Sequence, residues 1–161
     1  MKKIPTLFKR EFENNKVVRV LPEVTEGMEW VLEGKGIATE KLDGAACAII
    51  SGELYKRYDA KNGKPVPNGA IKCQEEPDPV TGHFPCWVKC SRDNPADKWF
   101  YSAFDNSGKL TDGTYEAIGS HFQNNPYNYL NKDLMIRHGA TILNVERSFE
   151  GIKHYLEANY I

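Results

Sequence analysis

The sequence predicts an α+β fold built from antiparallel strands and few helices. Three observations lead to this prediction. The expected strands outnumber the expected helices, they do not alternate with helices as β–α–β units, and the turn signal Ser51-Gly52 joins two of them directly. With 161 residues, 40% of them hydrophobic, the chain is expected to form one compact domain over residues 1–161.

In the first half of the chain we expect one helix and a strand hairpin. Thr25 is suited to cap a short helix that ends at Glu33, because glycines follow. A strand is then expected over residues 37–41. Residues 45–50 and 53–58 flank the Ser51-Gly52 turn and predict an antiparallel hairpin.

The second half is expected to begin with a long ordered loop, because residues 62–85 are rich in glycine and proline. Within it, residues 70–73 predict a short strand. Pro95 marks the first turn of a short aromatic helix. Further elements are expected as strands over residues 114–118 and 140–145 and as a final helix capped by Ser148.

Charge and hydropathy exclude several classes of protein. The 21 Lys and Arg residues nearly balance 22 Asp and Glu residues, so any attraction to a polyanion must be local. No apolar run approaches the roughly 20 residues needed to cross a bilayer, and no hydrophobic signal segment follows Met1-Lys2-Lys3. We therefore expect a soluble cytoplasmic protein with no membrane partner.

The cysteines are expected to be free thiols. Without a secretion signal, disulfides are not expected. A zinc site built from Cys73, His83, Cys86 and Cys90 is the alternative, but one loop would supply these ligands at irregular spacing. We favour buried thiols and assign no metal ligand.

The segment Glu40-Lys41-Leu42-Asp43-Gly44 is the strongest candidate for chemistry. A lysine attacks as a nucleophile only when its amine is neutral, which desolvation at a strand end in a pocket would favour. Asp43 is expected on the same face as Lys41, and Gly44 is expected to let the backbone approach a ligand. Taken alone, this pattern is more often an exposed turn with a solvated lysine.

Two further segments agree with this candidate. Lys56 and Arg57 place cationic groups suited to a ribose or a phosphate, and Glu116 places a carboxylate between apolar neighbours in a strand. Each also has an ordinary structural explanation, a solvated strand face or an edge strand.

In order and spacing, these three segments resemble the covalent nucleotidyltransferase superfamily of DNA ligases, RNA ligases and capping enzymes. Within it, the chain resembles the RNA ligase 1 family over nearly its whole length. The resemblance implies a nucleotidyltransferase (ATP-grasp-like) ligase fold, with antiparallel sheets around a nucleotide cleft. The segments that support this resemblance are Glu-Lys-Leu-Asp-Gly-Ala-Ala-Cys-Ala, Tyr-Lys-Arg-Tyr-Asp-Ala-Lys-Asn-Gly-Lys and Asp-Gly-Thr-Tyr-Glu-Ala-Ile-Gly.

The resemblance also implies roles for the first segment. Lys41 matches the lysine that attacks the α-phosphorus of ATP, expels pyrophosphate and holds AMP through a phosphoramidate bond. Glu40 matches a residue that borders the adenine pocket, and Asp43 and Gly44 complete the motif.

The other two segments match groups around the nucleotide. Arg57 matches an arginine that contacts the nucleotide sugar or the 5′-phosphate end, and Glu116 matches an acid that contacts the ribose. Lys56 and His121 are weaker candidates for RNA contacts. The implied cofactors are ATP and Mg²⁺ or Mn²⁺, and the implied partners are RNA ends, a 5′-phosphate that is sealed to a 3′-hydroxyl.

Two motifs of the family are not found in the chain. An acidic Glu-Gly-x-Val strand and a Lys-x-Lys strand are expected after the final helix, and the sequence ends at Ile161. Glu150-Gly151-Ile152 imitates the first of these, but we interpret it as helix. The fold is therefore expected to be incomplete at its C-terminus, with the missing segment supplied in cis or in trans.

Three alternatives remain open at this point. The first two are other members of the superfamily, a DNA ligase or a capping guanylyltransferase; the spacing of the motifs does not separate ATP from GTP as the nucleotide. The third is a non-catalytic fragment that binds a nucleotide or RNA. The last alternative predicts reversible binding of ATP without a covalent adenylate.

Overall fold

The computed structural model describes residues 1–61 and 63–160, and these divide into two compact units. The sheet unit consists of Met1–Lys3 and Lys41–Ala140, and the hairpin unit runs from Ile4 to Glu40 and resumes at Thr141. Each is described by itself. In the described part of the chain, no helix combines the length and the apolar character needed to span a membrane.

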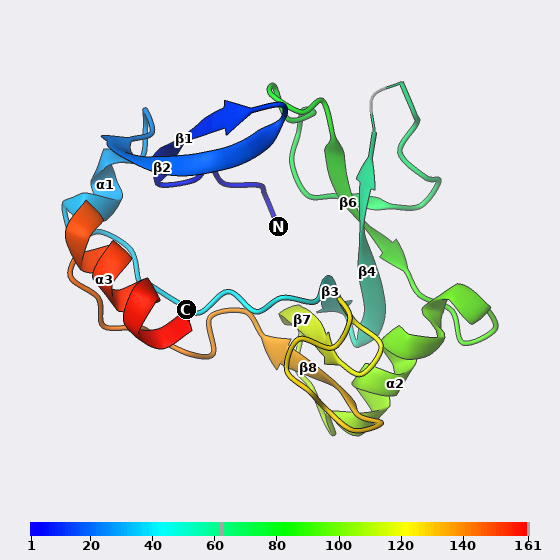
Figure 1. Cartoon of the computed structure of the whole chain (residues 1–161). Coiled ribbons are helices and arrows are strands. Elements are labelled where there is room, and N and C mark those ends of the chain that lie inside the picture. The colour runs from blue at the N-terminus through cyan, green and yellow to red at the C-terminus, as the bar shows by residue number, and fades with distance from the viewer. Residues whose placement is uncertain (62, 161) are drawn as a thin grey trace. The chain divides into compact units, whose positions relative to one another are not determined.

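The sheet unit contains a six-stranded antiparallel sheet in the order β5-β6-β4-β3-β7-β8 (Figure 1). The prediction of an α+β fold with antiparallel sheets is confirmed. The strands are β3 (Ala45–Ile50), β4 (Glu53–Ala60), β5 (Ile71–Lys72), β6 (Phe84–Lys89), β7 (Gly113–Gly119) and β8 (Asp133–Arg137). A 3-10 turn, η1 (Pro95–Asp97), leads into helix α2 (Lys98–Asn106).

The predicted hairpin is present as β3 and β4. Ser51 and Gly52 both adopt left-handed backbone angles, with φ of 51° and 77°, as a two-residue turn between twisted strands requires. The Asp112 carboxylate accepts hydrogen bonds from both turn amides, at 2.7 Å from Ser51 and 3.0 Å from Gly52. The turn is thereby tied to the segment that leads into β7.

Helix α2 covers one face of this sheet. Because successive strand residues point to opposite faces, Cys47 and Ile49 of β3 face the helix together. The buried core between helix and sheet consists of Cys47, Ile49, Leu54, Cys90, Ala103, Tyr115, Ala117, Phe122 and Met135. Burial of each large apolar side chain in this group contributes about 1.5–3 kcal/mol.

Two strands of the sheet were not predicted, and two predicted strands are wrong. Strand β6 begins in the loop expected over residues 62–85, and no element was expected over β8. In contrast, residues 37–41 and 140–145 form only one isolated bridge, between Thr39 and Ile142.

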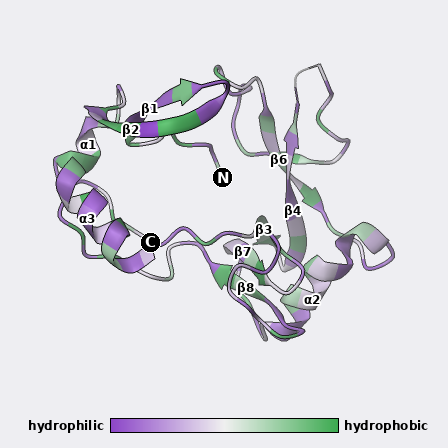
Figure 2. Ribbon diagram, viewed as in Figure 1, coloured by the Kyte–Doolittle hydropathy of each residue, from purple (hydrophilic) through white to green (hydrophobic). Residues whose placement is uncertain are grey.

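The hairpin unit pairs β1 (Phe8–Glu13) with β2 (Lys16–Val24) and adds α1 (Glu29–Leu32) and α3 (Phe149–Tyr160). Figure 2 shows hydrophobic and hydrophilic residues interspersed along β2. The β1–β2 hairpin was not predicted. Its turn, Asn14-Asn15, has positive φ at both residues, which asparagine tolerates well.

Helix α1 is shorter than predicted, and α3 begins as predicted. Gly27 has a φ of 86°, which prevents a helix from starting at Thr25. At α3, the Ser148 hydroxyl accepts a hydrogen bond from the Gly151 amide at 3.0 Å, as an N-cap does. Phe149 packs edge-on against Phe8, with ring centroids 5.1 Å apart, and so joins α3 to the β-hairpin.

Candidate functional site

Arg57 and Glu116 lie on the same side of the sheet, on either side of Ala46. Glu116 pairs directly with Ala46, and Arg57 is one residue beyond the Cys47–Lys56 pair, which places it opposite Ala46. Directly opposite residues in a sheet share a face and lie about 5 Å apart, so the two backbone positions are about 10 Å apart. The small Ala46 side chain leaves the space between the charged groups free of bulk.

Arg57 is mostly buried, and some of its N–H donors already have partners. Its side chain is 15% exposed. Nε donates to Asp59 Oδ1 at 3.0 Å, Nη1 donates to the Met1 carbonyl at 3.0 Å, and the guanidinium lies 5.8 Å from the centroid of the Trp87 ring. An arginine carries five N–H donors, so this arrangement fixes the guanidinium and leaves donors for an anionic ligand.

Glu116 is paired with a histidine that the sequence analysis did not identify. Its side chain is 13% exposed, and Oε1 lies 2.9 Å from His138 Nε2. The charge of Glu116 also acts on the thiol of Cys47. Burial raises the pKa of Cys47, and the negative charge of Glu116 raises it further. Glu116 is therefore a held carboxylate inside the sheet, and not a solvated residue of an edge strand.

The segment that contains Lys41 is irregular, which corrects the expectation that Lys41 ends a strand in a pocket. Residues 41–44 form no strand, and β3 begins at Ala45. The Lys41 side chain is exposed, and none of the described residues makes a hydrogen bond or an ion pair with it. Because this side chain is exposed, the desolvation expected at its amine is not observed.

Two side chains of the loop after β7 hold the backbone of Asp43 and Gly44. The Asp43 amide donates to the Tyr127 hydroxyl at 2.7 Å, and Gln123 Nε2 donates to the Gly44 carbonyl at 3.3 Å. A Cβ at Gly44 would lie 2.0 Å from the Ala117 carbonyl oxygen. Gly44 is therefore required for close approach to β7, and its expected approach to a ligand stays a prediction.

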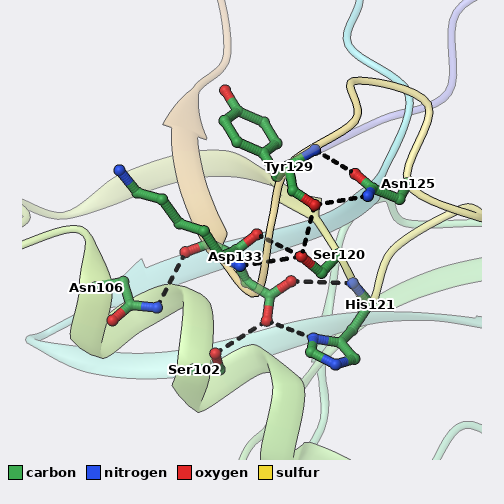
Figure 3. A network of polar contacts seen from close by, with 8 residues as sticks. Ser102, Asn106, Ser120, His121, Asn125, Tyr129 and Asp133 are labelled. Atoms are coloured by element: carbon green, nitrogen blue, oxygen red, sulfur yellow. Dashed lines mark hydrogen bonds and ion pairs between the residues drawn. The ribbon is translucent and has the colours of Figure 1, made fainter.

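The same loop is anchored at its base by a buried carboxylate (Figure 3). Asp133 is 1% exposed and lies at the start of β8. Its carboxylate accepts from the Ser102 hydroxyl at 2.9 Å and from the His121 amide at 3.0 Å, and it lies 2.8 Å from His121 Nδ1. These contacts join α2, β8 and the loop that reaches Asp43.

His121 is therefore a structural anchor, whatever else it contacts. Its ring stacks on Trp99 with centroids 3.4 Å apart and an interplanar angle of 3°. The contact with RNA stays a prediction.

Lys56 lies on the opposite face of the sheet from Arg57, because adjacent strand residues alternate. It forms an ion pair with Asp97, which is 1% exposed and also accepts a hydrogen bond from the Ser91 amide at 2.9 Å. The structure thus separates Lys56 from Arg57 and gives it a partner at the start of α2. Its contact with RNA also stays a prediction.

Glu40 belongs to the hairpin unit and is half-buried. Its amide donates to the Thr141 carbonyl at 3.0 Å, next to the isolated Thr39–Ile142 bridge. This contact fixes the backbone directly before Lys41. The adenine contact implied for its side chain stays a prediction.

The described residues contain no cluster of three or more His, Cys, Asp or Glu side chains that could hold a metal ion. The expectation of Mg²⁺ or Mn²⁺ stays a prediction, since Mg²⁺ at nucleotide sites is commonly held by one or two carboxylates together with the phosphates of the nucleotide. The four cysteines are free; Cys47, Cys86 and Cys90 are buried, and Cys73 is half-buried.

Three contacts of the site were missed by the sequence analysis: those of His138, Gln123 and Tyr127. His138 follows β8 and is placed by the β7–β8 register, which could not be predicted because β8 was not expected as a strand. Gln123 and Tyr127 act from a loop across more than 75 residues of sequence, with separations of 79 and 84 from their partners. No local pattern marks such contacts.

No protein-family model matches the chain, and no curated protein matches it. Membership in the RNA ligase 1 family therefore stays a prediction that rests on the residues quoted above.

Proposed function

We propose that this chain is the nucleotide-binding part of an ATP-dependent RNA ligase, with a nucleotidyltransferase fold, in which Lys41 forms a covalent adenylate. One observation carries the proposal. Arg57 and Glu116 flank Ala46 on one side of the sheet, and the strand that bears Ala46 begins directly after Lys41-Leu42-Asp43-Gly44. A cation for phosphate, an acceptor for ribose and an amine nucleophile are thus carried by β4, by β7 and by the segment that leads into β3.

The proposed first step is attack by the neutral Lys41 amine on the α-phosphorus of ATP. The Nζ–P bond forms, the bond from the α-phosphorus to the bridging oxygen breaks, and pyrophosphate leaves with that electron pair. The proton of the amine passes to water. Arg57 offers N–H donors to the negative charge that develops on the phosphate oxygens.

The next steps transfer AMP and seal the RNA. An oxygen of the RNA 5′-phosphate attacks the adenylate, which breaks the Nζ–P bond and returns the lysine. A 3′-hydroxyl then attacks the activated 5′-phosphorus, and AMP leaves. ATP and a divalent cation remain expectations of the resemblance.

Reversible nucleotide binding is the second candidate, and the exposure of Lys41 favours it. The amine is exposed, and none of the described residues forms a hydrogen bond or an ion pair with it. This candidate shares the Arg57 and Glu116 contacts but forms no bond to Lys41.

Transfer of a labelled phosphate separates these candidates. The chain is incubated with ATP labelled at the α-phosphate or at the γ-phosphate, and denatured before counting. The proposal predicts that protein retains the α-label and not the γ-label, and that Lys41→Arg abolishes retention. Binding of ATP without retained label would favour the second candidate, and label from GTP alone would favour a capping guanylyltransferase.

A further inference from the structure

His138 occupies a place next to Glu116 that its own backbone fixes. Its amide donates to the Thr114 carbonyl at 3.1 Å, so the residue lies just beyond the last β7–β8 pair, Tyr115–Arg137. Thr114 and Glu116 share a face of β7, and a diagonal neighbour on an adjacent strand is within reach of a long side chain. His138 Nε2 accordingly lies 2.9 Å from Glu116 Oε1.

The surroundings of the ring determine which nitrogen carries the proton. An ionised carboxylate only accepts hydrogen bonds, so the short contact requires a hydrogen on Nε2. Nδ1 is buried and has no hydrogen-bond partner among the described residues. In the contact with Glu116, the hydrogen on Nε2 therefore points to Oε1.

This contact occupies one oxygen of Glu116 and leaves the other free. Oε2 receives no hydrogen bond from a described residue. It is not a fully buried atom, so it is open to solvent. With Oε1 held, the carboxylate plane is set before a ligand arrives. Such an acceptor, prepared in advance, suits the hydroxyl groups of a ribose.

We infer that His138 is a positioning residue that fixes Glu116 as the acceptor for a hydroxyl of the ribose of a bound nucleoside triphosphate. This inference rests on the proposed function. It assigns His138 a role in the discrimination of ribonucleotides from deoxyribonucleotides at this site.

The test compares the affinities of the full chain for ATP, 2′-deoxy-ATP and 3′-deoxy-ATP by isothermal titration calorimetry. The wild type is expected to bind ATP about tenfold more tightly than the analogue that lacks the contacted hydroxyl, since a hydrogen bond to a charged acceptor has this strength. His138→Ala should lower that ratio by about three- to tenfold, because the Glu116 rotamer must then be ordered by the ligand.

Two amide variants distinguish positioning from general destabilisation. Glutamine places its amide nitrogen at about the reach of Nε2, and asparagine places it at about the reach of Nδ1. His138→Gln should therefore restore the wild-type ratio, and His138→Asn should not. His154→Ala, in α3, is the matched histidine control and should leave the ratio unchanged. Urea unfolding of each variant reports loss of folding separately.

The outcomes separate this inference from the proposed function. A wild type that binds no ATP overturns both. If ATP binds with a preference for ribose that Glu116→Gln abolishes, but His138→Ala leaves the ratio unchanged, only the inference is overturned. The inference is also overturned if Glu116→Gln leaves the ratio unchanged, or if asparagine restores it as well as glutamine.

Discussion

Cys47 and Cys90 are buried thiols for which ionisation is unfavourable in the folded protein. Burial raises the pKa of Cys47, and the nearby charge of Glu116 adds to this effect. Burial also raises the pKa of Cys90 to about 12, with a smaller contribution from the charge of Asp97. Both thiols therefore stay protonated where an unfolded chain, with a thiol pKa of about 8.5, loses protons.

These two residues predict a loss of stability at alkaline pH under reducing conditions. Because the folded pKa is raised, the contribution to stability is complete below about pH 8.5 and falls as the pH rises toward the folded pKa. Each thiol lowers the free energy of unfolding by up to about 1.4 kcal/mol per pH unit in this range. Urea unfolding from about pH 7.5 to about pH 10 measures the slope.

The matched controls are substitutions of single cysteines. Cys47→Ala should reduce the slope by about the contribution of one thiol, and Cys73→Ala, at a half-buried position, should change it little. Equal slopes in the wild type and in Cys47→Ala would contradict this account.

Asp97 gives a second prediction at the residue scale. Its buried carboxylate pairs with Lys56 and accepts the Ser91 amide. Asp97→Ala should lower the free energy of unfolding by about 2–3 kcal/mol, because it leaves a half-buried cation and an amide without partners. Affinity for ATP should be unchanged in the folded fraction, since Lys56 lies on the face away from Arg57. A strong loss of ATP affinity at constant folding would show that the two faces are not separate.

At the scale of elements, the loop between β7 and β8 connects a buried anchor to the segment of Lys41. Asp133 fixes its base through His121, and Tyr127 reaches the Asp43 amide. Tyr127→Phe removes that acceptor and should speed hydrogen exchange of the Asp43 amide by about tenfold, the equivalent of about 1.4 kcal/mol. Hydrogen exchange followed by NMR measures it.

Tyr129→Phe is the control from the same loop. Tyr129 bonds to Asn125 and Ser120 through its backbone, and its hydroxyl makes no hydrogen bond with a described residue. Tyr129→Phe should therefore leave the hydrogen-exchange rate of the Asp43 amide unchanged. Equal exchange rates at Asp43 in the wild type and in Tyr127→Phe would show that the loop does not hold this segment.

The elements that the sequence predicted correctly are those with strong local signals. The Ser51-Gly52 turn, the strand before it and the Ser148 cap each depend on residues close in sequence. Strand β6 was missed because it follows a loop rich in glycine and proline and contains Pro85, which lacks the N–H of a ladder residue. Residues 140–145 have the composition of a strand, but β8 occupies the place beside β7.

The residues of the candidate site could be predicted from the sequence, but most of their contacts could not. Lys41, Arg57 and Glu116 were selected from residue type and order, and register places the last two on one face. The exposure of Lys41, the Lys56–Asp97 pair and the role of His138 depend on which strands are neighbours. Local sequence does not contain that information.

At the scale of the whole molecule, the proposed chemistry depends on one unit. Lys41, Arg57, Glu116 and His138 all belong to the sheet unit. The chain carries a net charge of −1, so its proposed contacts with phosphates must come from local groups such as Arg57 and not from a general positive surface. The proposed ligase activity therefore depends on whether the amine at position 41 reacts.

The most direct measurement is localisation of an adenylyl group by peptide mass spectrometry after incubation of the chain with ATP and Mg²⁺. We expect the modification on Lys41, with loss in Lys41→Arg and strong reduction in Arg57→Ala. Modification of another lysine with Lys41 unmodified, or no modification of a chain that demonstrably binds ATP, would contradict this expectation.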